Sequence, residues 1–111
     1  MTDCSFLKKE RILKHSDFKT LYQRGKKTDT EHFLVFMRPN DLGWKRLGVT
    51  ASKATGNAVA RNYVKRLLRE YFRLHKTDLP ESSDILFIAK PRASELNYHS
   101  LCMELNNLFK T

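Results

Sequence analysis

The sequence predicts an α/β (α+β) sandwich, a single domain with the element order helix, strand, strand, helix, strand, helix and a small mixed sheet. Three observations support this fold class. Residues 56–76 carry apolar side chains at the spacing of a long amphipathic helix. Three short runs, 32–38, 47–53 and 84–90, are rich in the branched and aromatic residues of strands. The 111 residues contain no linker rich in Pro, Gly or Ser, so we expect one modest core.

The N-terminal part is expected to hold a basic arm and a short helix. Residues 1–14 are polar and basic, and they form either an extended segment or a mobile arm of the kind that contacts phosphate. Ser16 is a candidate N-cap and Gly25 a C-terminal stop, which predicts a helix over 17–24. One face of this helix carries Phe18, Leu21 and Tyr22.

The remaining elements follow from short apolar runs. After a polar link at 26–30, the strand 32–38 has apolar side chains on both faces, and the strand 47–53 is expected to pair with it as a hairpin. The run 84–90 suits a buried strand and is the expected parallel partner of 47–53. Residues 93–109 form an amphipathic helix with a structural role, with Ser94 near its start.

The long helix over 56–76 has two contrasting faces. Gly56 and Asn57 offer a turn and an N-cap. Its apolar arc faces the core and holds Ala60, Val64, Leu67, Leu68 and Tyr71. The opposite arc is cationic, with Phe72 at its edge, and holds Arg61, Asn62, Lys65, Arg66, Arg69 and Arg73.

This cationic arc predicts a polyanionic partner. A solvated helix face usually mixes signs, because like charges four residues apart cost roughly 0.2 to 0.5 kcal/mol per pair. Only Glu70 is acidic between Arg61 and Lys76, so the repulsion on this face is almost unrelieved. The regular rise of the cations along the helix suits a phosphate backbone and favours nucleic acid.

Charge and composition narrow the function classes. The formal net charge is +9, with 18 basic and 7 acidic side chains before residue 77 but 3 and 5 after it. The partner is therefore expected on the first two thirds of the chain. A hydrophobic content of 41% excludes a disordered basic tail, and no apolar run resembles a membrane span or a signal peptide, so a cytoplasmic protein is expected. Cys4 and Cys102 lack the spacing of a zinc site and are interpreted as reduced.

The residues do not predict a catalytic site. The histidines, His15, His32, His75 and His99, lie in separate elements. Asp29, Glu31 and His32 could hold a magnesium ion, but an acidic loop before a strand is the commoner explanation. No nucleophile elbow or phosphate-cradling glycine loop is present.

Three aromatic residues favour RNA over DNA. If the short helix packs beside the strand 32–38, Phe18, Tyr22 and Phe36 could line a cleft in which unpaired bases stack. An ordinary core position for all three is an equally good explanation from composition alone.

The stretch from Gly56 to Arg69 looks like the signature helix of the bacterial ribonuclease P protein subunit, usually written Arg-Asn-Arg followed by x-Lys-Arg-x-x-Arg. The resemblance extends in order over nearly the whole chain. It includes Leu7-Lys-Lys, Asp17-Phe18, Tyr22 with Gly25, Phe36, Val49 to Lys53 and Ile88-Ala-Lys-Pro-Arg-Ala.

The resemblance implies one ribonuclease P protein domain over residues 1–111, in a ribonucleoprotein whose catalyst is RNA and which removes the 5′ leader of precursor tRNA with Mg²⁺. The resemblance also implies that the protein alone is inactive and that the Mg²⁺ is held mainly by RNA. Neither a membrane nor an obligate protein partner is expected. By the resemblance, Arg61, Asn62, Lys65, Arg66 and Arg69 bind the catalytic RNA, and Phe18, Tyr22 and Phe36 bind the single-stranded leader. Arg73, on the same cationic arc, is expected to bind the catalytic RNA with them. Less firmly, the resemblance assigns RNA contacts to Lys53, Lys90 and Arg92.

One residue departs from the family motif, and one feature of the family fold departs from a general rule of chain topology. Tyr63 stands where the family motif has its second arginine, so one phosphate contact is either missing or replaced by stacking. The family also joins its two parallel strands by a left-handed crossover, whereas the general rule makes such connections right-handed. A ribosomal-type RNA-binding protein and a basic nuclease acting alone are the alternative functions.

Overall fold

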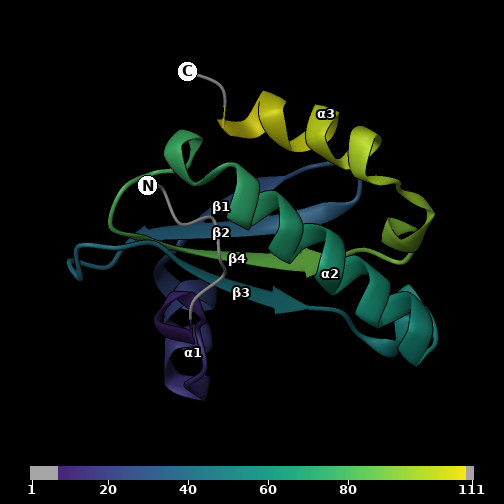
Figure 1. Ribbon diagram of the computed structural model, residues 1–111. Coiled ribbons are helices and arrows are strands. Elements are labelled where there is room, and N and C mark those ends of the chain that lie inside the picture. Colours follow the sequence, from purple (N-terminus) through teal and green to yellow (C-terminus); the bar gives the residue numbers. More distant parts are fainter. Residues whose placement is uncertain (1–7, 110–111) are drawn as a thin grey trace.

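The computed structural model describes residues 8–109 and has three helices and four strands. The strand order in the sheet is β1-β2-β4-β3, and the sheet separates α1 on one face from α2 and α3 on the other (Figure 1). The mixed α+β class predicted from the sequence is therefore confirmed. The elements are α1 (His15–Arg24), β1 (Lys26–Asp29), β2 (Phe33–Pro39), β3 (Arg46–Thr50), α2 (Ala58–Leu74), β4 (Ser83–Ala89) and α3 (Tyr98–Phe109).

The hairpin expected between residues 32–38 and residues 47–53 is wrong, because these two strands are not paired with each other. The polar link expected at residues 26–30 is also wrong. Residues Lys26–Asp29 form β1, which pairs antiparallel with β2, while β2 pairs on its other side with β4. β2 and β4 carry apolar side chains on both faces, and the two central positions of the sheet bury the most apolar surface. The polar β1 and the shorter β3, with its exposed Thr50, occupy the edges.

The connection from β3 to β4 contains α2 and is left-handed. The two strands are parallel, as the sequence predicts, with Leu47 opposite Ile85 and Val49 opposite Phe87. In Figure 1 both arrows point to the right, β4 lies above β3, and α2 lies in front of the sheet. This hand is the one that the family resemblance implies and the opposite of the general rule.

The predicted apolar arc of α2 is confirmed, with one correction. Val64, Leu67, Leu68 and Tyr71 are buried in a core shared with the sheet and α3. Phe72, placed by the helical wheel at the edge of the cationic arc, is 1% exposed. The loop that follows α2 folds back over this ring and brings Leu79 into the same core, which a wheel of one helix does not include.

The ends of the helices match the sequence in part. The Asn57 Oδ1 atom accepts a hydrogen bond of 2.9 Å from the Ala60 amide, so the predicted N-cap of α2 is confirmed. Ser16 does not cap α1, which begins one residue earlier, at His15. Ser94 lies in a separate 3₁₀ turn, and Asn97 caps α3 by accepting from the Ser100 amide at 2.8 Å.

Part of the basic arm is fixed to the edge of β3. The Ile12 amide donates to the Leu47 carbonyl oxygen at 3.0 Å, and Trp44 Nε1 donates to the Lys9 carbonyl oxygen at 2.9 Å. The buried Glu10 accepts from Lys76 Nζ at 2.9 Å. Lys8–Glu10 thus form a 3₁₀ turn, and residues 11–13 continue in extended form along the edge of the sheet. Residues 1–7 of the arm, including Cys4 and Leu7, lie outside the described residues.

Replacing Leu68 by Ala should lower the free energy of unfolding by about 2 to 5 kcal/mol, because this fully buried side chain would leave a cavity. Val59→Ala is the matched control on the same helix, since Val59 is 78% exposed, and it should change the stability by less than about 0.5 kcal/mol. Urea denaturation of both variants measures the difference. Equal midpoints would mean that the assigned core face of α2 is wrong.

Candidate nucleic-acid interface

The cationic arc of α2 faces away from the sheet. Asn62, Arg66 and Arg69 are exposed, and Arg61 and Lys65 are half-buried. Arg73 forms an ion pair with Glu70 one turn away. Among residues 8–109 the other four cations have no acidic partner within ion-pair distance, so their charge is available to a ligand.

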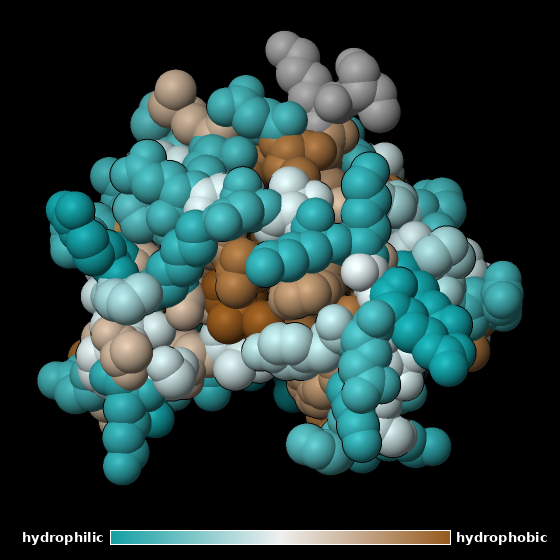
Figure 2. Space-filling view, turned by 180° about the vertical axis from the view of Figure 1, so that it is seen from behind, coloured by the Kyte–Doolittle hydropathy of each residue, from teal (hydrophilic) through white to brown (hydrophobic). Residues whose placement is uncertain are grey.

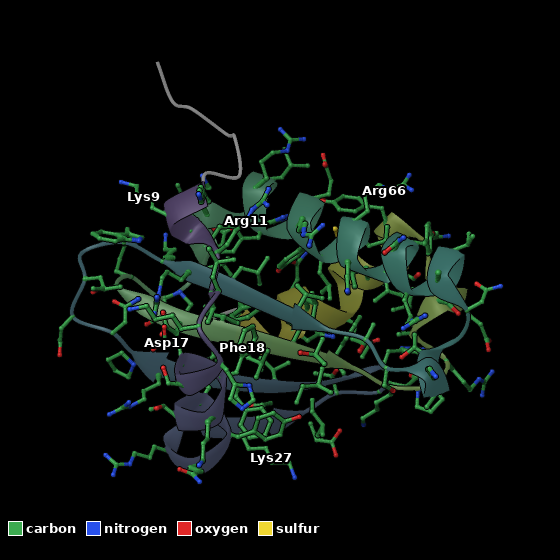
Figure 3. The ribbon with its side chains drawn as sticks, turned by 90° about the horizontal axis from the view of Figure 1, so that it is seen from below. Lys9, Arg11, Asp17, Phe18, Lys27 and Arg66 are labelled. Atoms are coloured by element: carbon green, nitrogen blue, oxygen red, sulfur yellow. The ribbon has the colours of Figure 1, made fainter. Side chains whose placement is uncertain are left out.

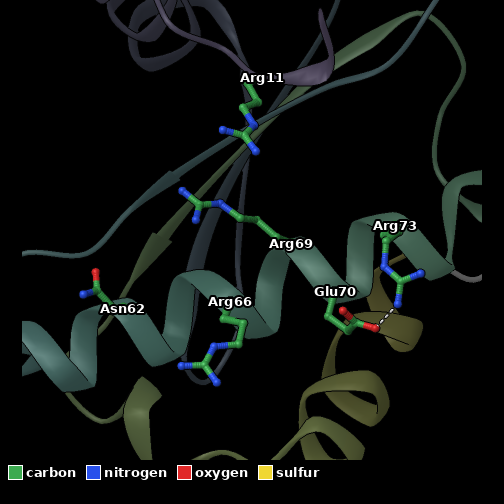
Figure 4. Close-up of a pocket in the computed structure, with 6 residues that line it drawn as sticks. All are labelled: Arg11, Asn62, Arg66, Arg69, Glu70 and Arg73. Atoms are coloured by element: carbon green, nitrogen blue, oxygen red, sulfur yellow. Dashed lines mark hydrogen bonds and ion pairs between the residues drawn. The ribbon is translucent and has the colours of Figure 1, made fainter. Parts of the chain in front are cut away.

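A groove of about 410 Å³ runs along this arc and also includes a residue from the arm. It is lined by Arg11, Asn62, Arg66, Arg69, Glu70 and Arg73 (Figure 4). Arg11 reaches α2 because its segment pairs with β3 at Leu47. The sequence marks Arg11 only as part of a basic arm, since nothing in the local pattern specifies this long-range pairing.

The three aromatic residues lie together on the opposite face of the sheet. Tyr22 and Phe36 are in ring contact, with centroids 5.1 Å apart and planes tilted by 41°. Phe18 packs over Gly48, where an added Cβ atom would come 2.8 Å from its ring. Phe36 is 6% exposed and belongs to the small core under α1, whereas Tyr22 is 53% exposed. The core explanation is therefore correct for Phe36, whereas Tyr22 is an accessible ring beside it, and the stacking of bases here stays a prediction.

The sheet beside these rings is only partly covered. α1 packs against β2 and β4 at one end of the strands, and Leu34 and Ile88, opposite one another on those strands, remain half-buried. Figure 3 shows α1 on the side of the sheet opposite α2, with Phe18 facing the strands. Figure 2 shows apolar surface in a shallow hollow of this face, surrounded by hydrophilic side chains.

The three less firmly assigned basic residues differ in their surroundings. Lys53 is exposed in the 3₁₀ turn Lys53–Thr55 between β3 and α2. Lys90 forms an ion pair with Asp29 and donates to the Thr30 carbonyl oxygen at 2.6 Å. The exposed Arg92 pairs with Glu95 at 3.1 Å. Of the three, only Lys53 has no such partner among residues 8–109.

The possible magnesium ligands are used in other contacts. Asp29 pairs with Lys90, and His32 Nδ1 lies 2.6 Å from an Oε1 atom of Glu104 on α3. Burial favours the neutral form of Glu104, but its hydrogen bonds with Thr30 and His32 outweigh this and hold its pKa below the ordinary value. No three His, Cys, Asp or Glu residues of the described chain converge as a metal site.

Tyr63 has a structural partner in place of the phosphate expected for the family arginine. Its hydroxyl donates to the Leu96 carbonyl oxygen at 2.8 Å, and its ring packs against the main core. This bond joins α2 to the segment before α3. The departure from the family motif therefore removes a cation from α2 and adds a contact between two elements.

These observations define a class of protein. It is a small α+β domain with a cationic helix face on which one arginine has an acidic partner, a hollow with an exposed aromatic ring, and no metal cluster in its described part. Such a surface suits a protein that binds a polyanion with unpaired bases.

Comparison with known proteins gives the family. The family model Ribonuclease P matches residues 6–111. The ribonuclease P protein component of Syntrophus aciditrophicus is 44% identical over 97% of this chain and 91% of its own length. The chain belongs to the ribonuclease P protein family, and so to the protein components of an endoribonuclease ribonucleoprotein with an RNA partner.

Solved structures agree with this assignment. The RNase P protein from Thermotoga maritima superimposes with a TM-score of 0.82 at 33% identity, covering 91% of this chain and 96% of that one. A Staphylococcus aureus RNase P protein mutant with defective mRNA degradation activity gives a TM-score of 0.85 at 35% identity, covering 93% and 87%. No helix in residues 8–109 is long and apolar enough to cross a membrane.

Replacing Tyr63 by Phe should lower the free energy of unfolding by about 0.5 to 1.5 kcal/mol, because the Leu96 carbonyl oxygen loses its hydrogen bond. RNA affinity should be unchanged, since no charge is removed. Tyr22→Phe, at an exposed ring, is the control for loss of a hydroxyl. A Tyr63→Phe protein with normal stability and weaker RNA binding would place Tyr63 in the RNA interface instead.

Proposed function

We propose that this protein assists a catalytic RNA in removing the 5′ leader of precursor tRNA. The observation that carries the proposal is the division of the molecule into two RNA-compatible surfaces on opposite sides of one sheet. A cationic face suits the backbone of a folded RNA, and an aromatic hollow suits a single strand.

The two surfaces are given different roles. Arg61, Asn62, Lys65, Arg66 and Arg69 bind the catalytic RNA, with Arg73 contributing beside its pair with Glu70. The leader lies in the hollow beside α1, on the partly covered face of the sheet, where its bases stack on Tyr22 and the edge of Phe18, above Phe36. The Mg²⁺ ions needed for cleavage are held mainly by RNA, and the particle works in the cytoplasm.

Reconstitution tests this function against the alternatives. The purified protein is mixed with precursor tRNA and Mg²⁺, with and without the bacterial catalytic RNA. Cleavage at the mature 5′ end only when that RNA is present supports the proposal. Cleavage by the protein alone would indicate an independent nuclease, and no effect on the catalytic RNA would favour a ribosomal-type RNA-binding protein. Because one solved relative is a mutant with defective mRNA degradation activity, an mRNA is included as a second substrate.

Arg66→Ala should weaken binding to the catalytic RNA and leave the stability nearly unchanged, because Arg66 is exposed on the groove. Loss of one phosphate contact should reduce the slope of log K against log salt by about 0.7 to 0.9. Lys19→Ala removes an exposed cation from α1 and serves as the control. An identical salt slope for wild type and Arg66→Ala would exclude Arg66 from the contacts.

Tyr22→Ala should weaken binding of precursor tRNA by the assembled particle and not that of mature tRNA, which has no leader. Stacking on an aromatic ring is worth about 1 to 3 kcal/mol per base, so the loss should be about 5-fold or more. Tyr22→Phe keeps the ring and should retain affinity. Phe36→Ala is less informative, because it also removes a buried side chain. Equal losses for both tRNAs would contradict leader binding in the hollow.

A further inference from the structure

A second, smaller pocket continues the cationic groove toward the aromatic face. Its volume is about 130 Å³, and it is lined by Ile12, Leu13, Phe18, Leu47, Gly48 and Val49, with Arg11 and Arg69 at its rim. The same two arginines also line the groove on α2. The groove on α2 and the pocket beside Phe18 therefore adjoin at these two side chains.

The two arginines converge from distant parts of the chain. Arg11 comes from the segment paired with β3, and Arg69 comes from the middle of α2. Figure 4 shows their guanidinium groups turned toward each other, while the carboxylate of Glu70 is directed to Arg73. A phosphate that lies between two guanidinium groups can accept hydrogen bonds from both.

The pocket beside Phe18 lies at the edge of the sheet, next to a part of β3 with which no other segment of residues 8–109 pairs. β3 is an edge strand, and the arm pairs with it only around Leu47. The Leu47 carbonyl oxygen points away from β4, because it accepts from the Ile12 amide. Residues two apart on a strand direct their amide and carbonyl groups to the same side, so those of Val49 also face outward. An extended strand can pass this edge without displacing a secondary-structure element.

We propose that Arg11 and Arg69 hold one shared phosphate of a single RNA strand that passes from the aromatic hollow, over the free edge of β3, onto the cationic face of α2. This inference rests on the proposed function and deepens it: the leader strand leaves the hollow and reaches, at Arg69, the edge of the face that binds the catalytic RNA. The pocket beside Phe18 lies at the bend in the path and is large enough for one base only, because sites for whole drug-sized ligands span roughly 300 to 1,000 Å³. Arg11 and Arg69 thereby set the path of the strand between the two surfaces.

The test uses the full-length protein without the catalytic RNA, and a fluorescent oligouridylate long enough to cover both surfaces. Arg11→Gln, Arg69→Gln and the double variant are compared across a salt series, with Lys19→Gln as the matched control. A shared phosphate predicts that each single variant weakens binding several-fold and that the double variant loses little more. The double variant should also lose about 0.7 of the salt slope, the value for one phosphate of a single strand.

Other outcomes would overturn the shared phosphate. Additive losses, with about 1.4 of the slope lost in the double variant, would mean two separate phosphates. Losses no larger than that of Lys19→Gln would remove both arginines from the path. An unchanged slope with increased aggregation would show that these cations only protect an exposed strand edge.

Two further measurements distinguish binding of an RNA strand from binding of a simple anion, and they do not depend on the proposed function. If pyrophosphate displaces the fluorescent oligouridylate as well as an unlabelled oligouridylate does, the two arginines form a simple anion site and the proposed strand path is wrong. A trinucleotide, too short for both surfaces, should respond to Tyr22→Ala or to Arg69→Gln but not to both, and a response to both would contradict one extended path. Because no catalytic RNA or tRNA is present, failure of the reconstitution assay would not affect these readouts.

Discussion

Burial of the apolar arc of α2 against the sheet is the constraint that the rest of the molecule depends on. Once Val64, Leu68 and Tyr71 are packed between the sheet and α3, the 3.6-residue period leaves the cations no direction but outward. The Tyr63 hydroxyl and the Asn57 cap limit rotation and fraying of this helix. The positions of the basic groups are thus fixed by hydrophobic packing on the far side of the helix.

The other face of the sheet is organised by a smaller set of contacts. Leu21, Phe36 and Leu86 form a core that holds α1 at one end of the strands, and Gly48 allows the Phe18 ring to approach β3. Asp84 accepts two hydrogen bonds from Arg46, whose guanidinium also lies 3.3 Å from Asp17 at the start of α1. This ion pair, together with the apolar contacts, positions α1 so that the sheet beyond it stays open.

Local pattern was sufficient for the elements whose signals lie within one segment. The Asn57 cap, the apolar arc of α2 and the parallel pairing of β3 with β4 followed from spacing and composition. The partner of β2 did not, because β3 and β4 are both apolar strands and no local residue chooses between them. β1 was missed since its Lys-Lys-Thr-Asp sequence has little strand propensity and is held by its neighbour alone.

The cationic arc and the aromatic hollow were also predictable only where their signals lie within one segment. Periodicity alone gave the cationic arc, but the burial of Phe36 and the approach of Arg11 to Arg69 depend on contacts between distant segments. The partner of Tyr63, the Leu96 carbonyl oxygen, lies 33 residues further along the chain and has no sequence signature. The hand of the β3–α2–β4 connection came from family resemblance, since general physical rules favour the opposite one.

The central position of β4 has a consequence for the chain during its synthesis. Of the four strands in residues 8–109, β4 is the last to leave the ribosome, yet it is the one strand paired with β3 and the inner neighbour of β2. A nascent chain that ends before residue 83 can form the β1–β2 pair but cannot join it to β3. The strongly basic first two thirds must therefore wait, without a completed sheet, beside ribosomal RNA until the weakly acidic last third emerges. The order of the strands makes completion of the sheet a late step in the folding of this domain.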